Sequence, residues 1–140
     1  MDLFYTVRQH VLKELDGMVA GGELPAGLDM TSVAVEPPRD PLHGDMATNA
    51  AMVLSKSAKK NPREIAENLA SRLSNVDIIE NLQVAGPGFL NLRISIKAWQ
   101  SNLNKILELG SAYGRTGLGK NLCVNVEFVS ANPTGPLHVG

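Results

Sequence analysis

The sequence contains little cysteine, few aromatic side chains and no marked excess of charge of either sign. Its single cysteine, Cys123, excludes a disulfide within the chain and fits a reducing compartment. Thirteen basic and fourteen acidic residues give a net charge of −1, so binding to nucleic acid would require a local patch. Aromatic residues make up only 4% of the chain, which leaves most of the packing to aliphatic side chains.

Long apolar runs are also missing from the 140 residues. None approaches the length of a membrane span, and the first ten residues lack the basic and apolar regions of a secretory signal. We therefore expect a cytoplasmic protein without a membrane partner. The hydrophobic fraction of 44% is typical of a globular protein, and the length allows one ordinary domain and a little more.

Apolar spacing and helix-end signals predict an α+β domain over residues 1–110, with helices packed on a small, mostly antiparallel sheet. The predicted elements are a helix from Asp2 to Gly21, a strand within 30–38, a helix within 46–56, a helix from Asn61, two strands around the turn 86–88, and a helix over 97–110. The last helix is expected to turn four apolar residues inward and to end at Gly110 as its C-cap: Trp99, Leu103, Ile106 and Leu107.

The composition changes after this domain. Residues 111–121 are rich in glycine and have no apolar period, so we interpret them as a linker. Residues 122–129 are more apolar than the earlier strands, as expected for a strand buried on both faces. The predicted organisation is therefore a domain over 1–110, a linker over 111–121 and the start of a second domain over 122–140.

The glycine-rich stretch 114–121 partly matches the pattern of a phosphate-binding loop. Gly114, Gly119 and Lys120 have the required spacing, but Asn121 stands where a Ser or Thr hydroxyl would bind magnesium. The predicted order of helix, loop and strand is also the reverse of the usual one. A flexible linker explains these glycines better.

Two groups of charged residues also have simpler explanations. His43 and Asp45 could form an acid–base pair, but we favour a turn in which Asp45 caps the following helix. A basic cluster could contact phosphates, although such clusters are usually solvated faces: Lys56, Lys59, Lys60 and Arg63.

The stretch 89–96 alternates with a period of two residues. Aliphatic side chains fall on the face that we expect to meet the core: Leu90, Leu92, Ile94 and Ile96. Phe89, Asn91 and Arg93 fall on the other face, and this combination suits an unpaired base. A ring can stack on the base, an amide can bond its edge, and a guanidinium can meet phosphate. The pattern alone favours the alternative of an edge strand whose polar face is covered by a helix.

The last fifteen residues, VEFVSANPTGPLHVG, suit the first strand and loop of a nucleotide-binding fold. His138 and Gly140 would then lie where the chain enters a helix, and helix N-termini favour phosphate. Gly140 would also let ATP approach the backbone closely.

This string resembles the His-x-Gly-His signature of class I aminoacyl-tRNA synthetases, and its wider context is similar to arginyl-tRNA synthetases. The matching positions are Glu127, Asn132, Pro133, Thr134, Gly135, Pro136, His138 and Gly140, together with the stretches 43–56, 61–70 and 86–92. The second His of the signature, the rest of a Rossmann-type catalytic domain, the Lys-Met-Ser-Lys loop and the anticodon-binding helices are missing. We therefore expect an N-terminal fragment of a longer protein.

The resemblance implies that residues 1–110 form the family's N-terminal additional domain, which contacts the D-loop corner of tRNA(Arg). Phe89 and Asn91 match positions that recognise a base, and Arg93 accompanies them. The whole protein would attach arginine to tRNA(Arg) through an arginyl-adenylate. Its substrates would include L-arginine and ATP, with Mg²⁺ accompanying the ATP, and no metal-binding residues are implied within this chain.

The resemblance also assigns roles near the end of the sequence. Glu127 and Asn132 match positions that hold the substrate arginine, and a carboxylate is a good partner for a guanidinium. Pro136, His138 and Gly140 match the ATP site, where His138 and Gly140 belong to the catalytic signature.

Two other interpretations stay open. The chain could be a free-standing tRNA-binding or interaction module, or part of another His-x-Gly-His nucleotidyltransferase. In the synthetase interpretation we expect a monomeric full-length protein and no adenylate formation by the 140-residue chain. We also expect the strand from Leu122 either to mediate self-association or to pair with the edge of the small sheet.

Overall fold

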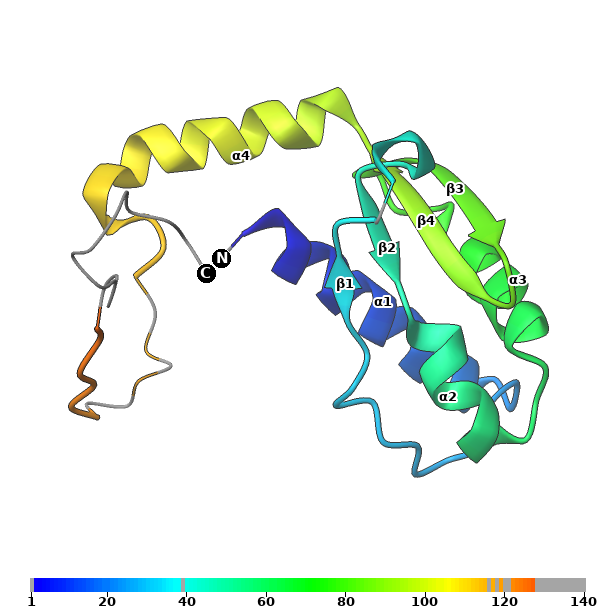
Figure 1. Cartoon of the computed structure of the whole chain (residues 1–140). Coiled ribbons are helices and arrows are strands. Elements are labelled where there is room, and N and C mark those ends of the chain that lie inside the picture. Colours follow the sequence, from blue (N-terminus) through cyan, green and yellow to red (C-terminus); the bar gives the residue numbers. More distant parts are fainter. Residues whose placement is uncertain (1, 39, 116, 118, 120–121, 128–140) are drawn as a thin grey trace, which may run out of the picture.

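The computed structural model describes residues 2–38, 40–115, 117, 119 and 122–127. Over these residues the chain forms a small antiparallel sheet packed with helices, which confirms the predicted α+β class (Figure 1). The elements in chain order are α1 (Leu3–Ala20), β1 (Val35–Glu36), η1 (Pro41–His43), β2 (Met46–Thr48), α2 (Ala50–Ala58), α3 (Pro62–Leu73), β3 (Ile79–Ala85), β4 (Phe89–Ile94), α4 (Ile96–Leu109) and η2 (Gly110–Ala112).

Helices α1 and α3 begin where local signals predict. The carboxylate of Asp2 accepts a hydrogen bond from the backbone N–H of Tyr5 at 2.7 Å, and α1 ends at Gly21. The side chain of Asn61 accepts from the N–H of Arg63 at 2.9 Å, one residue after the proline that opens α3. Each cap satisfies a backbone donor that the helix itself leaves without a partner.

The four strands lie in the order β1-β2-β4-β3, and all three neighbouring pairs are antiparallel. Consequently β4 is a central strand, and the alternative that made it an edge strand is wrong. In the observed register, Asn91 of β4 lies between Ala47 of β2 and Gln83 of β3. This register places Asn91 near the middle of one face of the sheet.

The β3–β4 hairpin forms around the predicted turn at 86–88. Gly86 and Gly88 both have positive φ, at 52° and 146°. A Cβ on Gly88 would lie 2.9 Å from the carbonyl group of Pro62, so a side chain there would strike backbone. The missing side chain therefore lets the hairpin turn approach the first residue of α3.

The core lies on one face of the sheet, between the strands and helices α1 and α3, while α2 packs against α3 and β4 (Figure 1). The predicted apolar face of α3 is buried here: Ile65, Ala66, Leu69 and Leu73. Leu90, Leu92 and Ile94 are buried as the strand alternation predicts. Ile96 is exposed instead, because the strand ends at Ile94 and Ile96 already begins α4.

An ion-pair group joins the end of α3 to α1 and to the turn after it. Arg72 pairs with Glu23 and lies 4.0 Å from Glu14. Its hydrogen bond with Glu23 raises the pKa of Arg72, so the guanidinium stays charged. These side chains are about one-third exposed or less, so the group fixes geometry at the border of the core.

The predicted helix within 46–56 is partly wrong. Met46–Thr48 forms a strand, and the helix begins only at Ala50. Asp45 does not cap this helix: its N–H donates to the Leu92 carbonyl at 2.9 Å, and its carboxylate accepts from the N–H of Ile94 at 2.8 Å. The Asp45 side chain thus stands where the carbonyl of a paired strand would lie, and it extends the pairing of β2 with β4.

The prediction for the last helix is correct in extent and wrong in environment. Gly110 is its C-cap, as expected, with a φ of 49°. However, Trp99, Leu103 and Leu107 are exposed, Ile106 is only partly buried, and among α4 residues only Ala98 is buried. The physical reason is that α4 extends away from the sheet and the core helices, so most of its apolar face is left exposed (Figure 1).

The strand predicted from Leu122 is absent from the described residues 122–127, which have no regular structure and are exposed. No described strand lies beside them, so the expected pairing with the edge of the small sheet is not observed there. Residues 128–140 lie outside the described residues. None of the described helices has the length and apolar character needed to cross a membrane.

Candidate nucleic-acid interface

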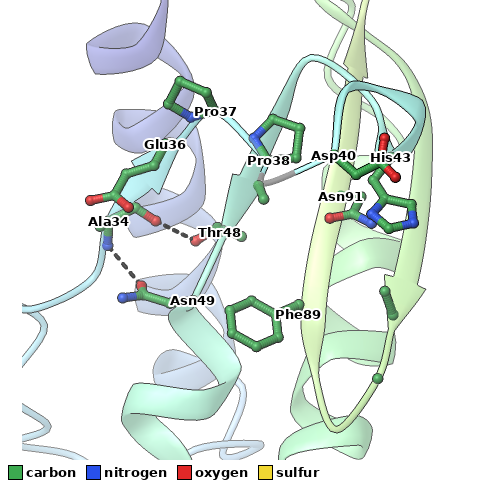
Figure 2. Close-up of a pocket in the computed structure, with 13 residues that line it drawn as sticks. Ala34, Glu36, Pro37, Pro38, Asp40, His43, Thr48, Asn49, Phe89 and Asn91 are labelled. Carbon is green, nitrogen blue, oxygen red and sulfur yellow. Dashed lines mark hydrogen bonds between the residues drawn. The ribbon is translucent and has the colours of Figure 1, made fainter.

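A hollow of about 630 Å³ lies on the face of the sheet opposite the core helices (Figure 2). Its floor is formed by strand residues that include Ala47, Asn91 and Ala85. One wall is formed by the segment between β1 and β2, which carries Pro38 and His43. The hollow therefore combines a rigid sheet floor with a wall from a connecting segment.

The amide of Asn91 is the main polar group of the floor. Only 7% of the residue surface is exposed, yet its side chain makes no hydrogen bond within the part of the chain that the structure describes. Its polar atoms are not sealed off, since no described side-chain polar atom is both fully buried and without a partner. A nearly buried amide that opens into a hollow can donate to and accept from a bound group.

Phe89 lies at the border of the hollow, at the start of β4 (Figure 2). It is 44% exposed, and in the register it faces the small residue Ala85. An aromatic ring left half-exposed beside a polar floor offers a stacking surface. The structure therefore brings Phe89 and Asn91 together, as the strand alternation predicts.

Arg93 does not belong to this hollow. It follows Asn91 by two residues and is exposed, but it is not part of the lining. The guanidinium is therefore available only to a group outside the hollow.

The charges of the lining oppose phosphate binding. Among the described residues that line the hollow, the ionisable side chains are those of Glu36, Asp40 and His43, and none is Lys or Arg. An anion in the hollow would face two carboxylates without a fixed cation. The lining instead suits a neutral, flat group that presents hydrogen-bond donors.

The wall was missed by sequence reasoning, which considered His43 as part of an acid–base pair with Asp45 and favoured a turn. Asp40 caps the short η1 helix by accepting from the N–H of Leu42 at 2.9 Å. Prolines at positions 37, 38 and 41 also restrict the segment. Three prolines within five residues, together with an Asp that can cap a helical turn, were the sequence signal that this segment has a defined conformation.

Two hydrogen bonds to Ala34, the residue before β1, attach the strand that leads into this wall to the end of β2 (Figure 2). The Thr48 hydroxyl donates to the Ala34 carbonyl at 2.8 Å, and the Asn49 side-chain oxygen accepts from the Ala34 N–H at 2.8 Å. Asn49 precedes α2 but makes no cap bond to it, because its side chain is used here. β1 and the segment after it are thereby held against β2.

The basic cluster on α2 and α3 is partly neutralised. Lys60 pairs with Glu64 at 3.4 Å and Arg63 pairs with Glu67 at 3.0 Å, both between residues four apart. Such exposed pairs contribute little stability, but they reduce the positive charge of the surface. None of these residues lines the hollow.

The residues predicted to bind arginine and ATP are not assembled in the described part of the chain. Glu127 is exposed and does not line the hollow. Asn132, Pro136, His138 and Gly140 lie outside the described residues. Within those residues, no three His, Cys, Asp or Glu side chains are grouped to hold a metal ion.

Comparison with known proteins gives a consistent result. The model of the arginyl tRNA synthetase N terminal domain family matches residues 6–94. The chain is 61% identical over all of its 140 residues to the arginine–tRNA ligase of Cereibacter sphaeroides strain ATCC 17025, and 58% identical to that of Ruegeria sp. strain TM1040. In each case the match covers 24% of the relative, so the chain spans about a quarter of its length.

A solved structure supports the fold. The crystal structure of arginyl-tRNA synthetase from Plasmodium falciparum superposes with a TM-score of 0.62 at 17% sequence identity. The superposition covers 76% of this chain and 18% of that one. At this identity the match is evidence for the fold alone.

Proposed function

Because the chain belongs to the arginyl-tRNA synthetase family, we propose that it is the tRNA-contacting N-terminal domain of an arginine–tRNA ligase. The observation that carries this proposal is the nearly buried amide of Asn91, which has no hydrogen-bond partner among the described residues and lies in the same hollow as the half-exposed ring of Phe89. A folded domain does not need either feature for its own stability. Both are expected where a base enters.

In this proposal an unpaired base from the D-loop corner of tRNA(Arg) occupies the hollow. Phe89 stacks against the base, and Asn91 pairs with its edge through one donor and one acceptor. A volume of about 630 Å³ falls within the range of small-molecule sites, so a base fits with room for its sugar at the mouth.

The separation of charges supports a defined orientation of the nucleotide. Glu36 and Asp40 disfavour phosphate inside the hollow, whereas Arg93 on the same face of β4 stands outside it. The base would therefore enter first, and the backbone phosphates would stay near Arg93. Phosphate contacts of this kind position a nucleic acid, whereas contacts to the base edge give specificity.

The remaining assignments extend the proposal to the whole ligase. Residues 111–121 would link the domain to a Rossmann-type catalytic domain that starts within 122–140. There Glu127 and Asn132 would hold L-arginine, while Pro136, His138 and Gly140 would bind ATP with its Mg²⁺. The whole ligase would act in the cytoplasm. The 140-residue chain would bind tRNA without arginine-dependent ATP–pyrophosphate exchange.

A double-mutant cycle on tRNA binding tests the proposal. Binding of tRNA(Arg) is measured at fixed salt for the unmodified chain and for Asn91→Ala, with intact tRNA and with tRNAs in which single D-loop bases are removed. We expect one base whose removal weakens binding to the unmodified chain but adds little for Asn91→Ala, since both changes delete the same contact. Strictly additive losses at every D-loop position would contradict base recognition by this hollow.

A further inference from the structure

The proposed function leaves the exposed apolar face of α4 unexplained. Ile96, Trp99, Leu103 and Leu107 recur every three or four residues and form what we call the α4 stripe. Leu103 is 53% exposed and Leu107 is 71% exposed. Apolar residues at this spacing occupy one side of a helix about 100° wide, which is the usual face for packing against another element.

Solvent alone is a poor environment for this helix. α4 has 14 residues, and isolated helices of about 12–15 residues are marginally stable in water unless an apolar face is packed. Among the described elements, the one that α4 contacts most is η2, the short turn that directly follows it in the chain. The helix therefore contains a packing surface that the described chain does not cover.

Three observations indicate what covers the stripe. The match to the N-terminal domain family ends at residue 94, just before α4 begins at Ile96. Similarity to the arginine–tRNA ligases nevertheless continues through α4, and about three-quarters of those relatives lies outside the match. Leu122, Val124 and Val126, which follow α4 in the chain, are also exposed and alternate as on one face of a strand.

We propose that the α4 stripe is an intramolecular docking surface for the rest of the ligase polypeptide. Its partner is an apolar surface on the domain that follows, with a polar rim to meet Lys97, Lys105 and Glu108 on the other sides of the helix. α4 thereby acts as a strut that fixes the direction in which the tRNA-contacting hollow faces. This inference depends on family membership and not on what the hollow binds.

Hydrogen exchange measured by mass spectrometry tests the docking surface. The 140-residue chain is compared with a polypeptide of the relatives' length that carries this sequence. We expect the amides of α4 to exchange at least tenfold more slowly in the longer polypeptide, because packing on the stripe stabilises the helix. The amides of α3 should be equally protected in both and serve as the internal reference.

A matched pair of substitutions assigns the effect to the stripe. Leu103→Asp and Asn104→Asp place the same charge at neighbouring positions, one on the stripe and one beside it. Leu103→Asp should return α4 exchange in the longer polypeptide to the rate seen in the 140-residue chain, and Asn104→Asp should not. Because Leu103 is exposed in the described structure, its substitution leaves the core intact, and unchanged α3 protection verifies this.

Other occupants give different results. Trp99 is the single tryptophan of the sequence, so its fluorescence in the 140-residue chain reports on the stripe alone. A blue shift that grows with protein concentration would show that a second copy covers α4, and would overturn the proposal. Equal α4 exchange in both polypeptides, or equal effects of the two Asp substitutions, would also overturn it. Loss of tRNA binding without a change in α4 exchange would concern only the hollow.

Discussion

Helices α3 and α4 are both amphipathic, but the apolar face of α3 is buried and that of α4 is exposed. Both have a polar face and an apolar face, and both begin at a side-chain cap. The apolar face of α3 is buried against the sheet and α1, whereas the face of α4 is open. Periodicity thus shows that a helix has a face to bury, while only the tertiary structure shows what buries it.

The strongest test of this contrast is Leu69→Ala in α3. Leu69 is fully buried, so we expect a loss of about 2–5 kcal/mol in the free energy of unfolding, from lost transfer energy and the cavity that remains. Urea denaturation of the 140-residue chain measures this loss. A change below about 1 kcal/mol would mean that α3 is not the core helix that the structure shows.

The close approach of the β3–β4 turn to α3 gives a second test. Gly88→Ala should cost on the order of 1–3 kcal/mol, because the φ of 146° disfavours a side chain and the new Cβ would strike the Pro62 carbonyl. Gly86→Ala is the matched control, since its φ is also positive but no atom lies within 4 Å of the added Cβ. We expect the control to show the smaller loss in thermal denaturation, and equal losses would refute the steric argument.

A third test asks whether the face of β4 that lines the hollow binds tRNA, just as the α4 stripe is proposed to bind the following domain. Phe89→Ala and Asn91→Ala should each weaken tRNA(Arg) binding by about 1–3 kcal/mol. Gln83→Ala is the control, because Gln83 lies beside Asn91 in the register but does not line the hollow. Binding that is unaffected by both substitutions, or equally reduced by the control, would make the hollow an ordinary surface.

The smallest effect is expected for Leu103→Ala in α4, the counterpart of Leu69→Ala. In the 140-residue chain this change should alter the free energy of unfolding by less than about 0.5 kcal/mol, since little buried area is lost. The same urea titration measures it. A loss comparable to that of Leu69→Ala would show that the stripe is already covered in this chain and would remove the contrast between the two helices.

The elements that could be predicted from sequence are those specified by neighbouring residues. Asp2 and Asn61 mark helix starts because each side chain bonds an N–H two or three residues away. The β3–β4 hairpin follows from Gly86 and Gly88, and the alternation along β4 correctly assigned its buried face. In each case the decisive contact is local or repeats with the period of the element.

What could not be predicted depends on residues far apart in the chain. Met46–Thr48 is too short and too close to an alanine-rich helix to show a strand pattern, and it becomes a strand by pairing with β4. Asp45 was expected to bond a nearby helix but bonds Ile94, which is 49 residues away. Likewise, only part of the hollow could be predicted. Alternation along the strand indicated Phe89 and Asn91, whereas the wall at Pro38 and His43 is formed by a connecting segment without a regular pattern.

The two hydrogen bonds to Ala34 have a consequence for how this surface can evolve. They attach the strand that leads into the wall to the end of β2 and to Asn49, while residues 40–43 of the wall are exposed. Substitutions in those residues would alter the shape and charge of the hollow at little cost in stability, whereas substitutions in the floor would disturb the central strand. Related ligases could therefore adapt to a different tRNA nucleotide by exchanging wall residues, without a loss of stability in the sheet.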